Sequence, residues 1–459
     1  MTDIRLSDYK NIHCIGIGGV GVSAIASILL ARGDRVSGSD MNENEIIKHL
    51  RKEGAIIYPD HRRENVEGAD LIIYSAAIAD ENPELVRARE LGIPMYTRAE
   101  ILGVLMKEFK DSIAISGTHG KTTTTSMVSL ILEKAGLDPT ILVGGTLREI
   151  GGNVKVGRSQ YFVTEACEYR DSFLELKPRI EVILNIDSDH MDYFKDIEHI
   201  VRSFKAFTRQ VPENGMIIAY DANPFVNQVL EDIPNAITYG YAQGSTYSIR
   251  DVKFTKDGMP NFHIFKDGEN LGEMQLSMPG EHNILNATAA FACCHELGVP
   301  PETIIKNMRG FTGTQRRFDI KGLTGKDVKI IDDYAHHPTE IKATLEAATK
   351  IPHGRTWTIF QPHTYTRTLA LFDEFANAFE KTDVLILTDI YAAREKNIYK
   401  VSSDKLAERI RTTHPDKDVR YIKEFQEIAD TVCREAEPGD LVITMGAGDV
   451  FKIGNMILK

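Results

Sequence analysis

The sequence predicts an α/β protein with three domains. The chain has 459 residues, which is too long for one ordinary hydrophobic core and corresponds to about three domains of ~150 residues each. Strands and helices alternate in the first hundred residues, and this alternation starts again near Lys110 and near Gly313. The expected domains therefore cover residues 1–109, 110–312 and 313–459. No tandem repeat or low-complexity segment separates them.

The first domain shows the βαβ pattern of a parallel sheet with right-handed crossovers. Buried strands run into small residues, and each helix that follows ends at a glycine. The expected strands are "NIHCIGIG" (11–18), "DRVSGSD" (34–40) and "ADLIIYSAAI" (69–78), and the expected helices are "GVSAIASILLARG" (21–33), "ENEIIKHLRKEG" (43–54) and "NPELVRARELG" (82–92).

The second domain begins with a strand, a tight loop and a long helix over residues 111–136. Short alternating runs between about residues 246 and 278 predict a small antiparallel patch. The other expected elements are strands at 160–166, 180–186 and 215–221 and helices at 198–211 and 282–298.

The third domain returns to the strand–helix pattern, beginning with "DVKIIDDYAHHPTEIKATLEAA" at residues 327–348. The remaining expected elements are a strand at 356–362, a helix at 367–379, a strand at 383–391 and a last strand–helix pair at 439–456.

Composition excludes several classes of function. The net charge of −12 argues against nucleic-acid binding, which needs a basic surface. No apolar run reaches the ~18 residues of a membrane helix, and the polar N-terminus is not a secretory signal. We therefore expect a cytoplasmic protein without membrane insertion, as a monomer or weak homodimer. The five cysteines are odd in number and fit reduced thiols: Cys14, Cys167, Cys293, Cys294 and Cys433.

The glycine-rich stretch "HCIGIGGVGVSAIA" joins the first strand to its helix and predicts a pyrophosphate cradle. Gly16 permits the turn, Gly18 and Gly19 allow close backbone approach, and Gly21 is expected to let the helix pack on the strand. Asp40 ends the second strand, 24 residues after Gly16, where a dinucleotide enzyme holds a ribose. Taken alone, this domain is Rossmann-like and its loop favours a nicotinamide or flavin cofactor.

A second glycine loop, "ISGTHGKTTTT", lies between the first strand and helix of the central domain. Its backbone N–H groups would cradle a triphosphate, with Lys121 at the β- and γ-phosphates and Thr122 on Mg²⁺. Ile115 replaces the first glycine of the usual pattern, so the loop is a shortened variant. The alternative is a threonine-rich helix start whose hydroxyls only cap the helix. The expected ATP-binding residues here are Gly117, Thr118, His119, Gly120, Lys121, Thr122 and Thr123.

Polar residues follow later strands of the central domain. Glu165 ends "FVTE" and His190 follows "LNIDSD", so both are expected in the crevice at the carboxyl ends of parallel strands. A carboxylate and an imidazole there can hold Mg²⁺ on nucleotide phosphates. The alternatives are a solvated carboxylate for Glu165 and a cluster at a helix N-terminus for His190.

Amide and arginine side chains follow near the second boundary. His282, Asn283 and Asn286 start a helix, where the amides could read an adenine edge or could cap the helix. Arg316 and Arg317 could move onto phosphates when domains close, or could form ordinary salt bridges.

Two strand ends of the third domain carry histidines. Asp332, Asp333, His336 and His337 follow one strand, and His363 and Arg367 follow another. A metal site at the histidine pair is one reading, but adjacent histidines point in different directions and no partner spacing supports it. Arg367 with His363 suits a carboxylate substrate better.

The ordered set of motifs resembles the ATP-dependent Mur ligases, which build the peptide of bacterial peptidoglycan. The resemblance covers essentially the whole chain, and it is the order of many motifs that makes it specific. They are "GIGGVGVSAIA", "YSAAI", "GTHGKTTTT", "NIDSDHMDYF", "GEHNILNATAA", "RRFD", "DDYAHHPTE", "FQPHTYTR" and "MGAGD".

The resemblance implies a Rossmann-like first domain for a UDP-sugar, a P-loop ATPase-like central domain for ATP and Mg²⁺, and a Rossmann-like third domain that closes the site and admits an amino acid. It also implies the reaction: the ATP γ-phosphate passes to the lactyl carboxylate of UDP-N-acetylmuramate, and L-alanine attacks the acyl phosphate to form an amide. In this family ADP and phosphate are released. A sister ligase that adds a recycled murein tripeptide to the same UDP-sugar is the alternative.

The resemblance also implies roles for individual residues. Lys121, Glu165 and His190 match catalytic positions, and Thr122, Glu165 and His190 match metal-associated ones. Asn286, Arg317 and Asp333 match positions around the ATP base, phosphates and ribose, and His336, His363 and Arg367 match the amino-acid and muramyl end. With ATP at the second loop, the first is left for the UDP-sugar, whose expected residues are Gly18, Gly19, Val20, Gly21, Asp40, Ser75 and Ala76.

Two segments depart from the family pattern. Many relatives have "EADESDASF" where this chain reads "EACEYRDSF", so Cys167 and Arg170 replace acidic residues. We therefore expect a metal role for Glu165 and none for the other residues of this segment. In "YAAREKN", Arg394 stands where many relatives have glycine. An oxidoreductase, argued from the first loop alone, and a non-catalytic ATP-binding switch are weaker readings, because neither explains the second loop together with the polar strand ends.

Overall fold

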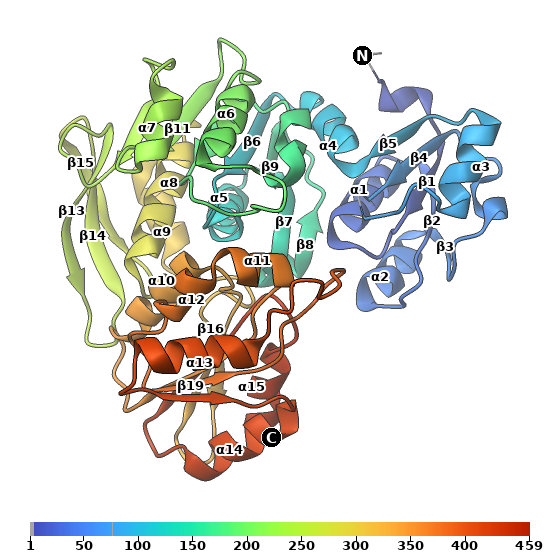
Figure 1. Ribbon diagram of the computed structural model, residues 1–459. Coiled ribbons are helices and arrows are strands. Elements are labelled where there is room, and N and C mark those ends of the chain that lie inside the picture. Colours follow the sequence, from blue (N-terminus) through green and yellow to red (C-terminus); the bar gives the residue numbers. More distant parts are fainter. Residues whose placement is uncertain (1–3, 76) are drawn as a thin grey trace.

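The computed structural model describes residues 4–75 and 77–459, which fold into three bodies, each with its own sheet (Figure 1). The body at the N-terminus has five strands in the order β3-β2-β1-β4-β5, all of them parallel. Its strands are β1 (Asn11–Ile15), β2 (Arg35–Ser39), β3 (Ile56–Tyr58), β4 (Leu71–Tyr74) and β5 (Met95–Thr97), and its helices are α1 (Val20–Ala31), α2 (Glu45–Glu53), α3 (Pro83–Leu91) and α4 (Arg98–Lys107).

The central body has ten strands in the order β15-β14-β13-β12-β11-β10-β6-β9-β7-β8. The strands around β6 pair in parallel, whereas β13, β14 and β15 form the expected antiparallel patch and β8 pairs antiparallel with β7. The strands are β6 (Asp111–Ser116), β7 (Thr140–Leu147), β8 (Gly152–Lys155), β9 (Tyr161–Glu165), β10 (Ile180–Ile183), β11 (Met216–Tyr220), β12 (Ile237–Gly240), β13 (Tyr247–Phe254), β14 (Pro260–Lys266) and β15 (Glu269–Gln275). The helices are α5 (Lys121–Lys134), α6 (Ile197–Thr208), α7 (Pro224–Leu230), α8 (Glu281–Glu296) and α9 (Pro301–Met308), and a short 3₁₀ segment, η4, spans Tyr169–Glu175.

The C-terminal body has six strands in the order β16-β17-β21-β18-β19-β20, with β16 alone antiparallel to its neighbour. The strands are β16 (Asp319–Leu323), β17 (Lys329–Asp333), β18 (Thr356–Phe360), β19 (Val384–Leu387), β20 (Asp418–Tyr421) and β21 (Leu441–Met445). The helices are α10 (Pro338–Ala348), α11 (Tyr365–Ala370), α12 (Phe372–Ala376), α13 (Ser403–Thr413), α14 (Phe425–Glu435) and α15 (Phe451–Ile457).

The predicted α/β class and parallel-rich sheets are confirmed, but one expected helix is wrong. The helix expected over residues 367–379 is two helices, because Leu371 has a non-helical backbone (φ −112°, ψ 27°) and ends α11 where α12 begins. The turn between them places Leu371 and Phe375 together in the core of the C-terminal body. Among the described residues, no helix is long and apolar enough to cross a membrane.

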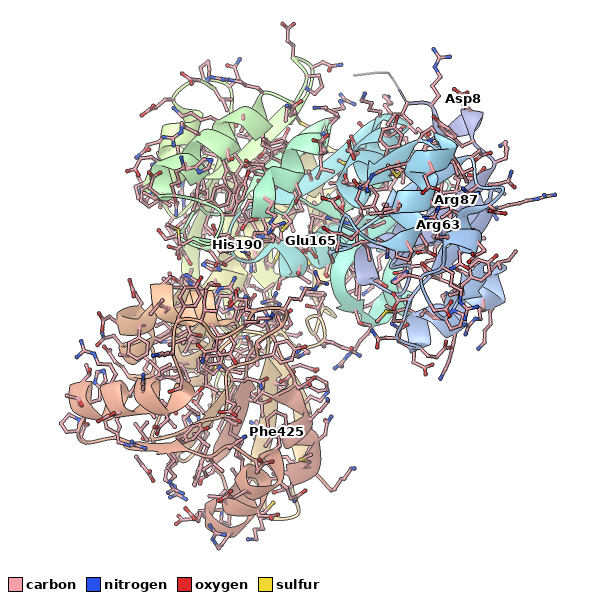
Figure 2. The ribbon with its side chains drawn as sticks, turned by 45° about the vertical axis from the view of Figure 1, so that its right-hand side comes forward. Asp8, Arg63, Arg87, Glu165, His190 and Phe425 are labelled. Atoms are coloured by element: carbon pink, nitrogen blue, oxygen red, sulfur yellow. The ribbon has the colours of Figure 1, made fainter. Side chains whose placement is uncertain are left out.

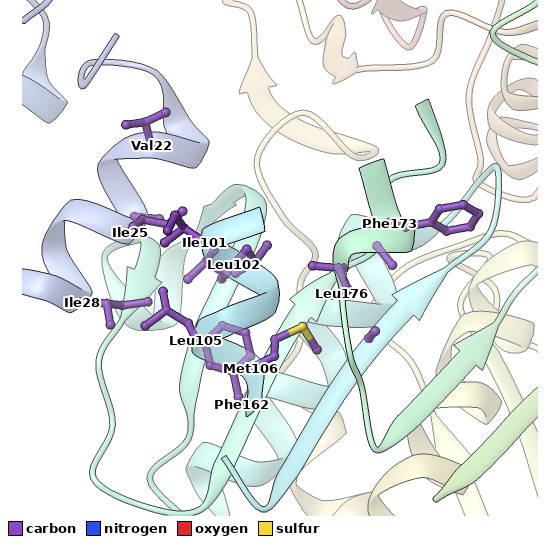
Figure 3. Packing of buried hydrophobic residues seen from close by; sticks show 14 of the residues in the cluster. Val22, Ile25, Ile28, Ile101, Leu102, Leu105, Met106, Phe162, Phe173 and Leu176 are labelled. Atoms are coloured by element: carbon purple, nitrogen blue, oxygen red, sulfur yellow. The ribbon is translucent and has the colours of Figure 1, made fainter. Parts of the chain in front are cut away.

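Helix α4 joins the first body to the central one (Figure 3). One hydrophobic cluster contains residues of α1, of α4 and of the central body, so the apolar side chains of α4 are buried from both sides. The labelled members are Val22, Ile25, Ile28, Ile101, Leu102, Leu105, Met106, Phe162, Phe173 and Leu176. Burying such a side chain stabilises a fold by about 1.5–3 kcal/mol, so this cluster holds the two sheets in a fixed relation.

Gly103 lets α4 reach this position. A Cβ atom at residue 103 would lie 2.0 Å from the Glu175 carbonyl oxygen, which is a backbone atom at the end of η4. Alanine in a helix interior normally stabilises it by roughly 0.5–1 kcal/mol relative to glycine. Here the contact with backbone outweighs that gain.

We predict that Gly103→Ala lowers the midpoint of urea unfolding, with an overpacking cost of about 1–3 kcal/mol. Gly325→Ala is the matched control, because a Cβ there meets no described atom within 4 Å. An unfolding midpoint for Gly103→Ala equal to or above that of the wild type would contradict the close approach.

Candidate active site

The loop between β6 and α5 has the geometry of a phosphate cradle. Gly117 and Gly120 adopt φ values of 129° and 88°, which favour glycine, and Gly120 caps α5 directly before Lys121. The N–H groups of Thr118 and His119 donate to the carbonyl and side-chain oxygens of Asn185, just beyond β10. The loop is thus held at the carboxyl end of the central strands, with the N-terminus of α5 behind it.

Lys121 is the cation of this loop. Its Nζ donates to the Thr118 carbonyl at 3.0 Å and to Glu168 Oε2 at 2.9 Å. Burial disfavours the charged amine, but the Glu168 carboxylate outweighs burial, so the pKa of Lys121 is raised and the ammonium stays charged. No role was expected for Glu168, because its pairing with Lys121 depends on how the loop after β9 folds back.

Hard oxygen donors lie beside Lys121. The Thr122 hydroxyl donates to Glu165 Oε2 at 3.1 Å, so the two oxygens are within reach of one ion. The His190 Nε2 lies 3.9 Å from Glu168 Oε1, and burial lowers the pKa of His190, which favours the neutral ring that a metal needs. Figure 2 labels Glu165 and His190 in the central body. The hydroxyl and the carboxylate fit a hard divalent cation such as Mg²⁺, and a neutral imidazole can serve as a further ligand of a divalent cation.

A cavity of about 390 Å³ opens beside the loop, between the central and C-terminal bodies. Asn286 lies against the loop, since a Cβ at Gly120 would come within 2.6 Å of its Oδ1. The sequence did not predict the aromatic lining from Tyr220 and Phe225. The predicted residues in the lining are His119, Gly120, Thr123, His282, Asn283, Asn286, Arg317 and Asp333.

The third body contributes Asp333 and Arg317 to this cavity. Asp333 accepts the N–H groups of Phe318 and Ala335 at 2.8 and 2.7 Å, and its burial raises the pKa to about 6 although Arg317 opposes the shift. Arg316 instead donates to Asp332 Oδ2 at 3.0 Å. Arg317 faces the cavity and also pairs with Glu340 at 3.8 Å, whereas Arg316 forms only an internal salt bridge among the ion pairs of the described residues.

A second cavity, of about 720 Å³, has His190 in its lining. His363 and Arg367 line it, and Arg367 Nη1 lies 3.1 Å from His363 Nδ1. Burial and the neighbouring cations lower the pKa of His363 to about 3, so its ring is neutral. The His336 ring packs on His363 with centroids 5.7 Å apart, which brings all three predicted residues together.

The glycine loop of the first body turns at Gly16, with φ of 77°. Asp40 accepts the N–H groups of Gly18 and Asn42 at 2.9 and 3.0 Å, so its carboxylate braces this loop. The expectation for Gly21 is wrong: a Cβ there would meet Arg98 Cδ at 2.5 Å, so the glycine makes room for a side chain of α4 and not for a strand.

The other residues predicted to bind the UDP-sugar lie beside Gly16 or at the start of α1. Ser75 lies beside Gly16, where a Cβ at residue 16 would be 3.8 Å from the Ser75 Cβ, whereas Ala76 lies outside the described residues. Gly19 caps α1 and Val20 is its first residue. Val20 lines a cavity of about 450 Å³ that also touches Asn153 of the central body, and Asn153 Nδ2 donates to the Val20 carbonyl at 3.2 Å.

His119 ties the phosphate loop to the C-terminal body. Its Nε2 lies 3.1 Å from Asp187 Oδ2 and its Nδ1 lies 3.4 Å from Glu340 Oε1 on α10. Burial disfavours a charged ring, but the two carboxylates outweigh it and raise the pKa of His119 to about 9. The protonated ring therefore donates to a carboxylate of each body.

Three further contacts cross the same junction. Thr339 Oγ1 donates to Asp187 at 2.7 Å, His337 Nε2 donates to the Ser188 carbonyl at 3.0 Å, and Arg367 pairs with Asp189 at 3.0 Å. The adjacent histidines do diverge, since His336 contacts Glu340. The ligand atoms of His119, Asp187 and His337 are close enough to hold a cation. The protonated His119 ring, however, has no free lone pair for a metal and itself supplies the positive charge beside Asp187.

Comparison with known proteins matches descriptions of one family to three segments of the chain. Three family descriptions match it: "Mur ligase family, catalytic domain" over residues 11–110, "Mur ligase middle domain" over 115–294 and "Mur ligase, glutamate ligase domain" over 316–448. A protein named UDP-N-acetylmuramate–L-alanine ligase from Acetivibrio thermocellus is 50% identical over 453 residues, covering 98% of this chain and 96% of that one.

Solved structures are similar over nearly the full length. A crystal structure of UDP-N-acetylmuramate-alanine ligase from Thermotoga maritima has a TM-score of 0.81 at 27% identity, covering 97% of this chain and 98% of its own. A murein peptide ligase from Psychrobacter arcticus has a TM-score of 0.72 at 24% identity, with 98% of both chains covered, and so shares the fold.

The pKa of His119 gives a prediction for stability. Because the folded-state pKa lies above the unfolded value of about 6.5, the stabilisation is fully present below pH 6.5 and is lost as the pH rises through about 9. We expect His119→Gln to reduce the free energy of unfolding by about 1–3 kcal/mol near pH 6 and by much less near pH 9.5. Urea unfolding at several pH values measures this difference.

The control is His49→Gln, because His49 lies exposed on α2 away from the junction. Its unfolding curve should follow the wild type at each pH. A His119→Gln penalty that stays constant between pH 6 and 9.5 would rule out the protonated bridge.

Proposed function

The chain belongs to the Mur ligase family, and we propose that it joins L-alanine to the lactyl carboxylate of UDP-N-acetylmuramate, with conversion of ATP to ADP and phosphate. The observation that carries this proposal is the 50% identity, over 98% of the chain, to a protein named for that reaction. The product is a precursor of the peptidoglycan peptide.

ATP takes the cavity of about 390 Å³ beside the phosphate loop. Its base lies by Asn286 and its ribose by Asp333, and its phosphates lie by Arg317 and the N-terminus of α5, where Lys121 is the first residue. Lys121 is suited to this role because its ammonium is held charged where the γ-phosphate would lie. Enzymatic transfer of a phosphoryl group depends mainly on positioning of the reactants and neutralisation of their charge.

Thr122, Glu165 and His190 would hold Mg²⁺, which neutralises charge on the moving phosphoryl group. A carboxylate oxygen of the UDP-sugar forms a bond to the γ-phosphorus while the bond to the β-phosphate oxygen breaks. The acyl phosphate that results is attacked by the amine of L-alanine, which arrives deprotonated. The tetrahedral intermediate then collapses and releases phosphate.

The cavity of about 720 Å³ receives the amino acid and the lactyl end. Arg367 supplies a positive charge for the L-alanine carboxylate, and the neutral His363 ring, on which His336 packs, shapes the wall beside it. The UDP diphosphate lies on the first glycine loop, at Gly18, Gly19 and the N-terminus of α1. Asp40 then acts on the uridine side mainly by holding that loop.

The direct test is phosphate release from ATP with UDP-N-acetylmuramate and each candidate amine donor. We expect turnover that requires both Mg²⁺ and L-alanine. Release with the murein tripeptide and none with L-alanine would overturn the proposal in favour of the sister ligase.

Lys121→Ala is the companion variant. It should abolish phosphate release while binding of the UDP-sugar, measured by calorimetry, stays at the wild-type value, because the first glycine loop lies in another body. Wild-type rates in this variant would remove Lys121 from the mechanism.

A further inference from the structure

The segment "CEYRDSF", which departs from the family pattern, is bound to the loop that carries His190. The Tyr169 hydroxyl donates to Asp192 Oδ2 at 2.9 Å, and the Tyr193 hydroxyl donates to Asp171 Oδ2 at 2.6 Å. The two bonds run in opposite directions between the same two segments. We call these four residues the tyrosine–aspartate clasp.

The ring of Tyr169 also covers His190. The two ring centroids lie 4.7 Å apart with an interplanar angle of 36°, and both side chains line the cavity of about 720 Å³. The guanidinium of Arg170, the next residue along the chain, lies 5.5 Å from the Tyr169 ring centroid. Tyr169 therefore limits the positions that the His190 imidazole can take.

Both clasped segments contain backbone that needs external support. Arg170, Asp171 and His190 have φ values of 53°, 56° and 56°, in the left-handed region that residues other than glycine rarely adopt. Such conformations persist where the surrounding structure fixes them, and they gather at functional sites. Here Asp171 is fixed from outside as well, because it also accepts the hydroxyl of Ser203 on α6.

We propose that the clasp positions His190 as a ligand for the divalent cation. The inference rests on the metal role of His190 in the proposed function. Tyr169 and Tyr193 act through the His190 loop and are positioning residues. Their hydroxyls hold the loop on η4, and the Tyr169 ring supports the imidazole. Groups that orient a metal-binding histidine usually matter almost as much as the ligands.

The test is the full-length double variant Tyr169→Phe/Tyr193→Phe, which removes both hydroxyls and keeps both rings. Mn²⁺ is titrated in the presence of ADP, and the electron paramagnetic resonance signal of free Mn²⁺ reports binding without any turnover. We expect the Mn²⁺ affinity to fall about 10-fold or more. Binding of ADP without metal should stay at the wild-type value, which shows that the fold is intact.

Two reference variants make the outcomes distinct. Tyr421→Phe removes a tyrosine–aspartate bond of the same kind, from the Tyr421 hydroxyl to Asp389, on strand β20 of the C-terminal body, and should bind Mn²⁺ like the wild type. His190→Gln should weaken Mn²⁺ binding at least as strongly as the double variant.

The clasp is refuted if His190→Gln weakens Mn²⁺ binding while the double variant stays within twofold of the wild type. It is also refuted if Tyr421→Phe loses as much affinity as the double variant. If His190→Gln binds Mn²⁺ like the wild type, the metal role of His190 fails, and the clasp loses its function with it.

Discussion

A half-buried, protonated histidine joins the phosphate loop to the C-terminal body, and the site depends on that contact. His119 lies between Asp187 and Glu340, so one ring neutralises a carboxylate of each body. A carboxylate removed from water without a partner would destabilise the fold. The protonated ring of His119 lies between two carboxylates, and its attraction to both offsets the free energy of desolvation. The same junction brings Asp333 and Arg317 to the cavity beside the loop. Separation of the two bodies would dismantle both the nucleotide cavity and the amino-acid cavity.

Charge placement inside the central body follows the same logic. Lys121 is held by Glu168, and Glu168 in turn lies near His190, so the cation of the loop and the metal-associated histidine share one carboxylate. The loop that carries His190 is anchored on one side by Arg367 through Asp189 and on the other by Tyr169 through Asp192. Residues from two bodies thus determine where one imidazole lies. Such preorganisation is how an enzyme stabilises the charge of a transition state.

The sequence predicted the features that follow from hydrophobic periodicity and from short local motifs. Hydrophobic strands, glycine turns and helix starts follow from short-range rules, so the three sheets and both glycine loops were accessible, and so were polar residues at strand ends such as Glu165 and Asp333. Contacts between segments that are far apart in the sequence could not be predicted in this way. The pairing of Lys121 with Glu168, the bond from Arg316 to Asp332, and the approach of Arg98 to Gly21 all depend on how segments far apart in the sequence meet in the fold. The break at Leu371 was missed because the apolar spacing continues through it.

The central claim is that this site forms an acyl phosphate on the lactyl carboxylate before the amide bond. The most direct measurement uses UDP-N-acetylmuramate with ¹⁸O in that carboxylate, together with ATP and L-alanine, and mass spectrometry of the released phosphate. If the account is right, each phosphate carries one ¹⁸O atom, because the oxygen that attacks the γ-phosphorus leaves with it. Phosphate without ¹⁸O, released at the rate of amide formation, would contradict it.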